Sequence, residues 1–156
     1  MQQRRVLPAT EYSHTQHAPL CLILYGSAVV CIAVALTTDD VVGTAIGIGV
    51  GLFIGLLAPT FHHLTVKDQG EFLDVHFGPV PLCRKAVRYS EIEDVEVGRT
   101  LILDGWGIHM SVRGGWVWNL WGRDCVVVHF KNGGTLRIGT DDAEHLASFL
   151  RSRLSD

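Results

Sequence analysis

The sequence of 156 residues lacks the short motifs that carry most enzyme chemistry. It has no G-x-S-x-G nucleophile motif, no P-loop to cradle a phosphate, and no kinase or Rossmann fingerprint. We therefore expect a protein that is not an enzyme, with no catalytic residue and no cofactor.

Spacings typical of metal ligands and disulfide frameworks are also missing. The four cysteines form no C-x-x-C pair, and no two of the eight histidines are spaced H-x-x-x-H. Ligands two residues apart would share one face of a strand, and no histidine pair has that spacing either. We expect buried apolar thiols, ordinary interfacial or surface histidines, and no metal site.

Basic charge is in short supply. The net charge is -3, from 13 basic and 16 acidic side chains, which argues against a nucleic-acid partner. Arg84, Lys85 and Arg88 form the only basic cluster, and each could contribute roughly 1 kcal/mol to contact with anionic lipid headgroups. Glu91 and Glu93 lie close by in the sequence, so a solvated strand face is the alternative.

Charge is absent from two long apolar runs, Leu20–Leu36 and Val41–Phe61, which are separated by four polar residues. A transmembrane helix needs roughly 17 to 25 apolar residues to cross about 30 Å of hydrocarbon. The sequence thus predicts a transmembrane helical hairpin. The predicted organisation is a cytoplasmic tail (1–19), the hairpin (20–61, with helices at 20–36 and 41–58) and a second domain (62–156).

The charges that flank the runs predict their orientation. Arg4 and Arg5 precede the first run, and Asp39 and Asp40 lie in the loop between the runs. The positive-inside tendency therefore predicts a multi-pass protein of the cell inner membrane with both termini cytoplasmic. Cleavage of a signal peptide after Ala35 is the alternative, which the length of the first run disfavours.

Glycine recurs at every fourth position of the second run. A stripe of this kind lets another backbone approach closely, which favours helix association in lipid. Either the first helix packs on the stripe through Ala28 or Ala35, or a second copy does so in a homo-oligomer. The residues of the stripe are Gly43, Gly47, Gly51 and Gly55.

After Phe61 the apolar residues alternate with period two. Asp68-Gln69-Gly70 and Asn132-Gly133-Gly134 predict tight turns, and an amphipathic helix is expected to end the chain. The spacing predicts about seven short strands in a small barrel or sandwich, with the helix against one end.

Three segments of this region resemble the bacterial pleckstrin-homology-like family. They are Gly105-Trp106-Gly107-Ile108, the strand that ends at Asn132-Gly133-Gly134, and Ile138-Gly139-Thr140-Asp141 before the last helix. The resemblance covers residues 62–154 and implies an α+β membrane protein: a transmembrane helical hairpin, then a PH-like seven-stranded β-barrel or sandwich with a C-terminal α-helix. His109 departs from the arginine expected there, so an arginine-dependent contact at this position is in doubt.

Four tryptophans gather in one short segment: Trp106, Trp116, Trp118 and Trp121. One interpretation is that they pack in the core and at the end of the barrel. The other is an exposed aromatic surface for a membrane or a partner, because Trp suits surfaces with one apolar and one wet side.

Together these features predict a membrane-anchored PH-like interaction module at the cytoplasmic face of a bacterial membrane, binding a protein partner or a lipid headgroup. The alternative is a small oligomeric membrane protein, a pore or transport subunit, assembled through the glycine stripe. Charges inside the apolar runs would favour the alternative, and the runs have none.

Overall fold

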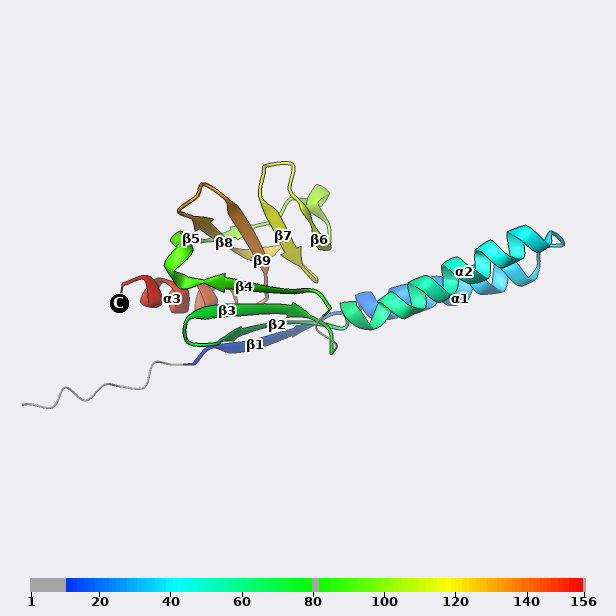
Figure 1. Ribbon diagram of the computed structural model, residues 1–156, viewed down its shortest axis with the longest axis horizontal. Coiled ribbons are helices and arrows are strands. Elements are labelled where there is room, and N and C mark those ends of the chain that lie inside the picture. The colour runs from blue at the N-terminus through cyan, green and yellow to red at the C-terminus, as the bar shows by residue number, and fades with distance from the viewer. Residues whose placement is uncertain (1–10, 80–81, 156) are drawn as a thin grey trace, which may run out of the picture.

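The computed structural model describes residues 11–79 and 82–155, which form a two-layered β domain with a pair of helices projecting from it (Figure 1). The first layer is a four-stranded antiparallel sheet in the order β1-β2-β3-β4. Its strands are β1 (Ser13–His17), β2 (His63–Asp68), β3 (Phe72–Phe77) and β4 (Arg84–Arg88).

The second layer is a five-stranded sheet in the order β5-β8-β9-β7-β6. Its neighbours are antiparallel except for β7 and β9, which run parallel. Its strands are β5 (Ile92–Arg99), β6 (Gly107–Met110), β7 (Trp116–Asn119), β8 (Asp124–Phe130) and β9 (Thr135–Gly139). The helices are α1 (Leu20–Leu36), α2 (Val41–Leu57) and α3 (Ala143–Leu154), with short 3-10 turns η1 (Ala58–Phe61), η2 (Tyr89–Glu91) and η3 (Ile102–Asp104).

The two turns predicted from the sequence are confirmed. Gly70 and Gly133 have positive φ angles of 84° and 81°, which a glycine adopts without strain. The preceding Asp68 and Asn132 each accept a hydrogen bond from a backbone amide two residues later, at 2.8 and 2.9 Å. These turns join β2 to β3 and β8 to β9 in antiparallel pairs.

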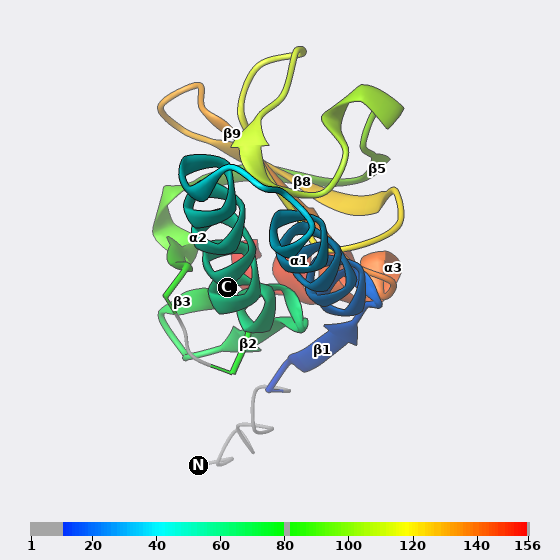
Figure 2. The same cartoon turned by 90° about the vertical axis from the view of Figure 1, so that its right-hand side faces the viewer.

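One apolar core lies between the sheets, and Figure 2 shows the two layers from the side of the projecting helices. Inward-facing residues alternate along the strands of both sheets, as the period of a strand requires. Helix α3 adds Leu146 and Leu150 to the core and lies at the end of the domain opposite the helical pair (Figure 1). The largest fully buried side chains include Phe77, Leu64, Leu73, Ile92, Leu120, Leu136 and Ile138.

The helical pair is inserted between two neighbouring strands. β1 precedes α1, β2 follows α2 and η1, and the two strands pair from Ser13↔Lys67 to His17↔His63. Tyr12 ties the same segment to α3, because its hydroxyl donates to Asp142 at 3.1 Å and its ring stacks on Phe149. Cleavage after Ala35 would remove a strand of the sheet, which argues against the signal-peptide alternative.

The predicted seven-stranded barrel is wrong, because the described residues form nine strands in two sheets. The additional strands are β1 and β7. β1 lies at a sheet edge and has the polar sequence Ser-His-Thr-Gln-His, so its residues resembled a tail and showed no apolar alternation. β7 lies in a segment rich in Gly and Trp, where propensity is uninformative.

The predicted transmembrane hairpin also needs correction, and with it the multi-pass location. Among the described residues only Val41–Phe61 is a helix long and apolar enough to cross a membrane. α1 is apolar but has 17 residues, which rise about 25 Å, less than the hydrocarbon thickness of about 30 Å. The prediction failed for α1 because its 17 residues lie at the lower limit of the range for a transmembrane helix.

A buried ionic group joins the first sheet to α3. Asp68, at the end of β2, accepts hydrogen bonds from the Tyr89 hydroxyl at 2.7 Å and from the Arg153 guanidinium. Burial alone would raise the pKa of Asp68, but the hydrogen bonds from Tyr89, the Gly70 amide and Arg153 outweigh it and lower that pKa. The folded state therefore favours the ionised carboxylate.

We expect Asp68→Asn to lower the free energy of unfolding by about 1–3 kcal/mol near pH 7, because Arg153 would lose its charged partner. A lowered pKa contributes stability above the unfolded pKa of about 4 and loses it as pH falls. The difference from the wild type should therefore shrink below about pH 4. Denaturation followed by fluorescence across this pH range measures it.

Asp94→Asn is the matched control, because Asp94 is exposed on β5. Its unfolding free energy should differ little from that of the wild type. A deficit in Asp68→Asn that stays constant from neutral to acid pH would contradict the role of the ionised carboxylate.

Candidate functional site

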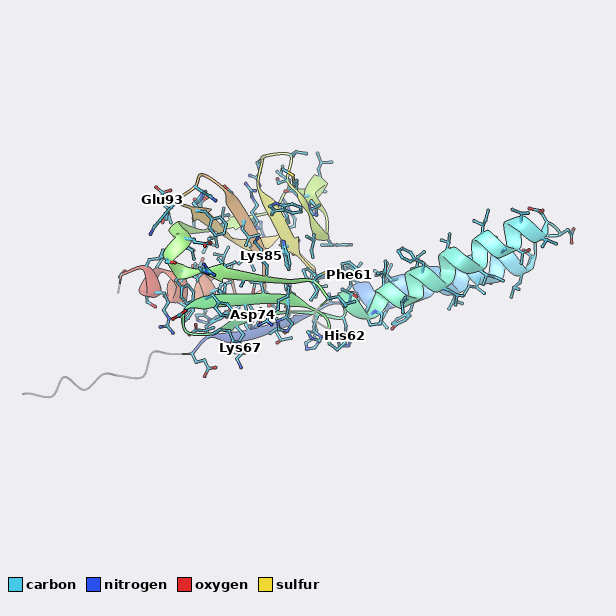
Figure 3. All side chains as sticks on the ribbon, in the orientation of Figure 1. Phe61, His62, Lys67, Asp74, Lys85 and Glu93 are labelled. Carbon is cyan, nitrogen blue, oxygen red and sulfur yellow. The ribbon has the colours of Figure 1, made fainter. Side chains whose placement is uncertain are left out.

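The candidate site is the side of the β domain from which α1 and α2 project, together with the helices themselves (Figure 3). We call residues 17–19 and 58–63 the root of the helical pair. Phe61 of the root packs on Phe77 of β3, with ring centroids 5.9 Å apart, and lies beside Gly107 at the start of β6. The root therefore contacts both sheets.

The outer surface of the helical pair is apolar. Only 11% of the most apolar stretch of Val41–Phe61 is buried. α2 is therefore not a core helix of the domain. Fifteen large apolar side chains of α1 and α2 are exposed. They are Leu22, Ile23, Tyr25, Val29, Val30, Val34, Leu36, Val41, Val42, Ile46, Val50, Leu52, Phe53, Leu56 and Leu57.

The glycine stripe of α2 faces α1. A Cβ atom on Gly47 would lie 2.6 Å from Ala35 Cβ, and one on Gly51 would lie 2.5 Å from Ile32 Cγ1. Gly55 has Ala28 Cβ as its neighbour, at 3.7 Å. A second copy could reach Gly47 and Gly51 only if α1 moved away.

The tip of the helical pair is closed by polar contacts. Asp40 caps α2, since its carboxylate accepts from the amides of Val42 and Gly43 at 3.4 and 2.7 Å. A Cβ on Gly43, the first glycine of the stripe, would meet this carboxylate at 3.0 Å and not α1. The Thr44 hydroxyl donates to the Ala35 carbonyl of α1 at 3.1 Å.

The four tryptophans do not form one surface. Trp118 is buried in the core, 5.8 Å from Phe77 between ring centroids. Trp106 is 47% exposed and stacks on Trp121 with centroids 4.2 Å apart. Trp116 is 48% exposed and pairs with Met110, at the end of the β6–β7 pair that is far from Trp106.

Trp106 and Trp121 line an apolar groove of about 430 Å³ with Leu101, Ile102 and Gly105. We call it the Trp106 groove. Ile102 is 78% exposed and its neighbour Leu103 is 85% exposed, so the rim of the groove is apolar as well. Figure 1 places β6 on the side of the domain from which the helical pair projects.

The basic residues of β4 divide between two faces. Arg84 and Arg88 point to one face of the strand, whereas Lys85 shares the other face with buried Val87. Arg84 donates to Asp74 at 2.6 Å, so its charge is already paired. β4 therefore does not present one continuous basic surface to lipid headgroups.

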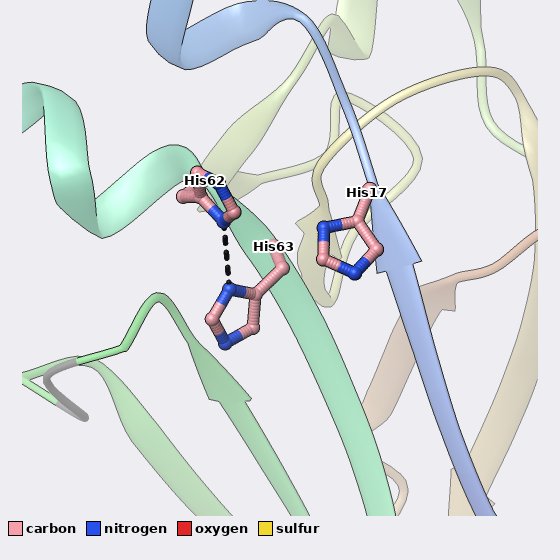
Figure 4. Close-up of side chains that lie close together, drawn as sticks. All are labelled: His17, His62 and His63. Atoms are coloured by element: carbon pink, nitrogen blue, oxygen red, sulfur yellow. Dashed lines mark hydrogen bonds between the residues drawn. The ribbon is translucent and has the colours of Figure 1, made fainter.

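Three histidines meet at the root, a grouping that the sequence spacing did not reveal. His17 ends β1, whereas His63 begins β2 and His62 directly precedes it, 45 or more positions later (Figure 4). A cross-strand pair of this kind has no fixed spacing in the sequence. The grouping could have been predicted only from the pairing of β1 with β2. That pairing was not expected, because the polar sequence of β1 resembles a tail.

Neither family models nor curated proteins match this chain. The resemblance to the bacterial pleckstrin-homology-like family therefore stays a prediction. Function has to be argued from the helical pair, the Trp106 groove and the root.

The glycine stripe makes a prediction about helix packing. Gly51→Ala should destabilise the helical pair by about 1–3 kcal/mol, because the new Cβ would collide with Ile32 and with the Ala28 carbonyl at 3.0 Å. Thermal unfolding followed by the helical circular dichroism signal in detergent micelles measures the change.

Gly49→Ala is the matched control on the same helix, because nothing lies within 4 Å of the added Cβ. It should leave stability unchanged or raise it by about 0.5–1 kcal/mol through helix propensity. Equal shifts in both variants would show that the stripe does not pack on α1.

Proposed function

We propose that the protein is a non-enzymatic interaction module held at a membrane through α2, the one described helix long and apolar enough to cross it, with α1 packed along α2 and the β domain at the cytoplasmic surface. The carrying observation is the exposed apolar surface of the helical pair. A soluble monomer rarely exposes more than a few hundred Å² of contiguous apolar surface, and fifteen large apolar side chains on one projection exceed that.

Lipid is the environment that accepts such a surface. Burying a Val, Leu, Ile or Phe side chain stabilises by roughly 1.5–3 kcal/mol, so the full set favours hydrocarbon strongly. Backbone groups inside a bilayer must be paired, and both segments are helical with no charged side chain. The charged residues Asp39 and Asp40 are confined to the tip.

The fold and the charges support the orientation. β1 and β2 pair directly before α1 and directly after η1, so both ends of the helical pair lie on the side of the β domain. The basic residues of β4 belong to that side, and the acidic tip lies away from it. Arg4 and Arg5, which precede α1 in the sequence, lie outside the described residues. The positive-inside tendency then favours a cytoplasmic β domain.

The Trp106 groove supports a second contact with the same membrane. It opens beside the root, and its rim carries Ile102, Leu103 and the Trp106 ring. Tryptophan favours the boundary between headgroups and hydrocarbon, since its ring is apolar and its N–H is polar. We infer that the groove rests on lipid and limits rotation of the β domain about the helical pair.

Lysine in the middle of each helix should release the protein from membranes. Val29 and Val50 are exposed and central, so Val29→Lys and Val50→Lys leave the helix contact intact. Each lysine should oppose insertion by about 2.5–3.5 kcal/mol. We expect the wild type to float with liposomes in a density gradient and the double variant to stay at the bottom.

Val112→Lys is the control, because Val112 is an exposed apolar residue of the β6–β7 loop and not of the helices. It should float like the wild type. A wild type that is monodisperse without detergent and does not float would rule out the anchor.

Brominated lipids test the Trp106 groove, because bromine quenches tryptophan near the headgroup boundary. Trp106→Phe should remove a large part of the quenching that liposome-bound protein shows, and Trp121 in the same groove should account for the rest. Trp116→Phe is matched in exposure but lies farther from the root, so it should leave the quenching nearly intact. Equal losses in both variants would show that the groove has no special contact with lipid.

A further inference from the structure

The three histidines of the root form a compact cluster. His17 is the last residue of β1, His63 is the first residue of β2, and the two face each other in the antiparallel register. His62 directly precedes His63 and follows η1. Figure 4 shows the three rings gathered where the chain enters and leaves the helical pair.

The rings make a nearly equilateral triangle. Ring centroids are 5.5 Å apart for His17 and His62, 5.6 Å for His17 and His63, and 5.3 Å for His62 and His63. Each ring offers one nitrogen so that all three lie within 4.8 Å of one another. The Nδ1 atoms of His62 and His63 are already 3.0 Å apart.

This triangle has nearly the size that a shared metal ion requires. With metal–nitrogen bonds of about 2.0–2.1 Å at tetrahedral angles, three imidazole centroids lie about 5 Å apart and their ligating nitrogens about 3.4 Å apart. The His62 and His63 nitrogens lie near that spacing. His17 and His62 are exposed, so rotation of their side chains could close the remaining gap.

We propose that His17, His62 and His63 bind one transition-metal ion of the Zn²⁺ class, with a fourth coordination position open to water. Imidazole suits Zn²⁺, Ni²⁺ and Cu²⁺, whereas Ca²⁺ and Mg²⁺ require oxygen ligands that this cluster does not contain. The sequence spacing had led us to expect no metal site, and the cross-strand pairing of β1 with β2 is the reason to revise that expectation.

Burial lowers the pKa of His63 below its usual value, and the neighbouring His62, His17 and His76 lower it further. His76 itself is engaged by Asp74, 3.2 Å from its Nδ1 atom.

A bound ion would join the two segments that bracket the helical pair. His17 fixes the chain before α1, and His62 and His63 fix it after η1. The metal would therefore crosslink the segment before α1 to the segment after η1. This crosslink would make the attachment of the helices to the β domain more rigid. This role does not depend on the membrane, so it can be tested in detergent.

The test is Zn²⁺ titration of the full chain, purified without a histidine tag in detergent micelles, by competition with a chromophoric chelator. We expect one ion per chain. His17→Gln, His62→Gln and His63→Gln should each weaken Zn²⁺ binding by about tenfold or more. Mutation of a residue that only hydrogen-bonds to a metal ligand already lowers the affinity for the metal by about 10–100-fold. Co²⁺ should give the visible absorption of a tetrahedral site, and each variant should lose it.

His145→Gln is the control, since His145 is an exposed histidine that pairs with Asp142 at 2.6 Å, outside the cluster. It should bind Zn²⁺ like the wild type, and circular dichroism should show that all variants are folded. The proposal fails if a variant that carries all three substitutions binds Zn²⁺ as tightly as the wild type. It also fails if His145→Gln weakens binding as much as the substitutions in the cluster do. A third outcome that contradicts it is an apparent affinity for Zn²⁺ that rises with protein concentration, because the ion would then bridge two copies of the chain.

Discussion

The pairing of β1 with β2 is the constraint on which the rest of the structure depends. Five residues before the first helix lie against five residues after the second, so both ends of the helical pair are fixed to one sheet. A polar edge strand thus holds an apolar projection in place. Without this pairing the segment before α1 would lose its backbone attachment to the first sheet, and the histidines of the root would not meet.

The same constraint fixes the helical pair relative to the β domain. Phe61 contacts β3 and lies beside β6, so the direction of the helices is set relative to both layers. The Trp106 groove then has a defined place near the root, because Gly107, next to Trp106, lies beside Phe61. The helical pair and the groove would then meet the same membrane under the proposed function, and a metal ion at the root would stiffen the joint between them.

Local features could be predicted well from the sequence. The apolar runs gave both helices almost to the residue, because uninterrupted apolar residues between polar punctuation have few alternatives to a helix. Turns at Gly70 and Gly133 followed from residues that tolerate positive φ. The strand count failed at β1 and β7, because an edge strand can be polar and a Gly- and Trp-rich segment shows no alternation.

The sequence by itself determined that this chain contains two uncharged apolar helices beside a β-rich domain, since composition and period depend only on neighbouring residues. Only the tertiary structure decided which side chains share a surface. It separated Trp118 from Trp106, set Lys85 on the face opposite Arg84, turned Gly47 and Gly51 toward α1, and brought His17 to His63. Those outcomes rest on cross-strand register and helix packing, which join residues far apart in the chain and leave no fixed spacing in it.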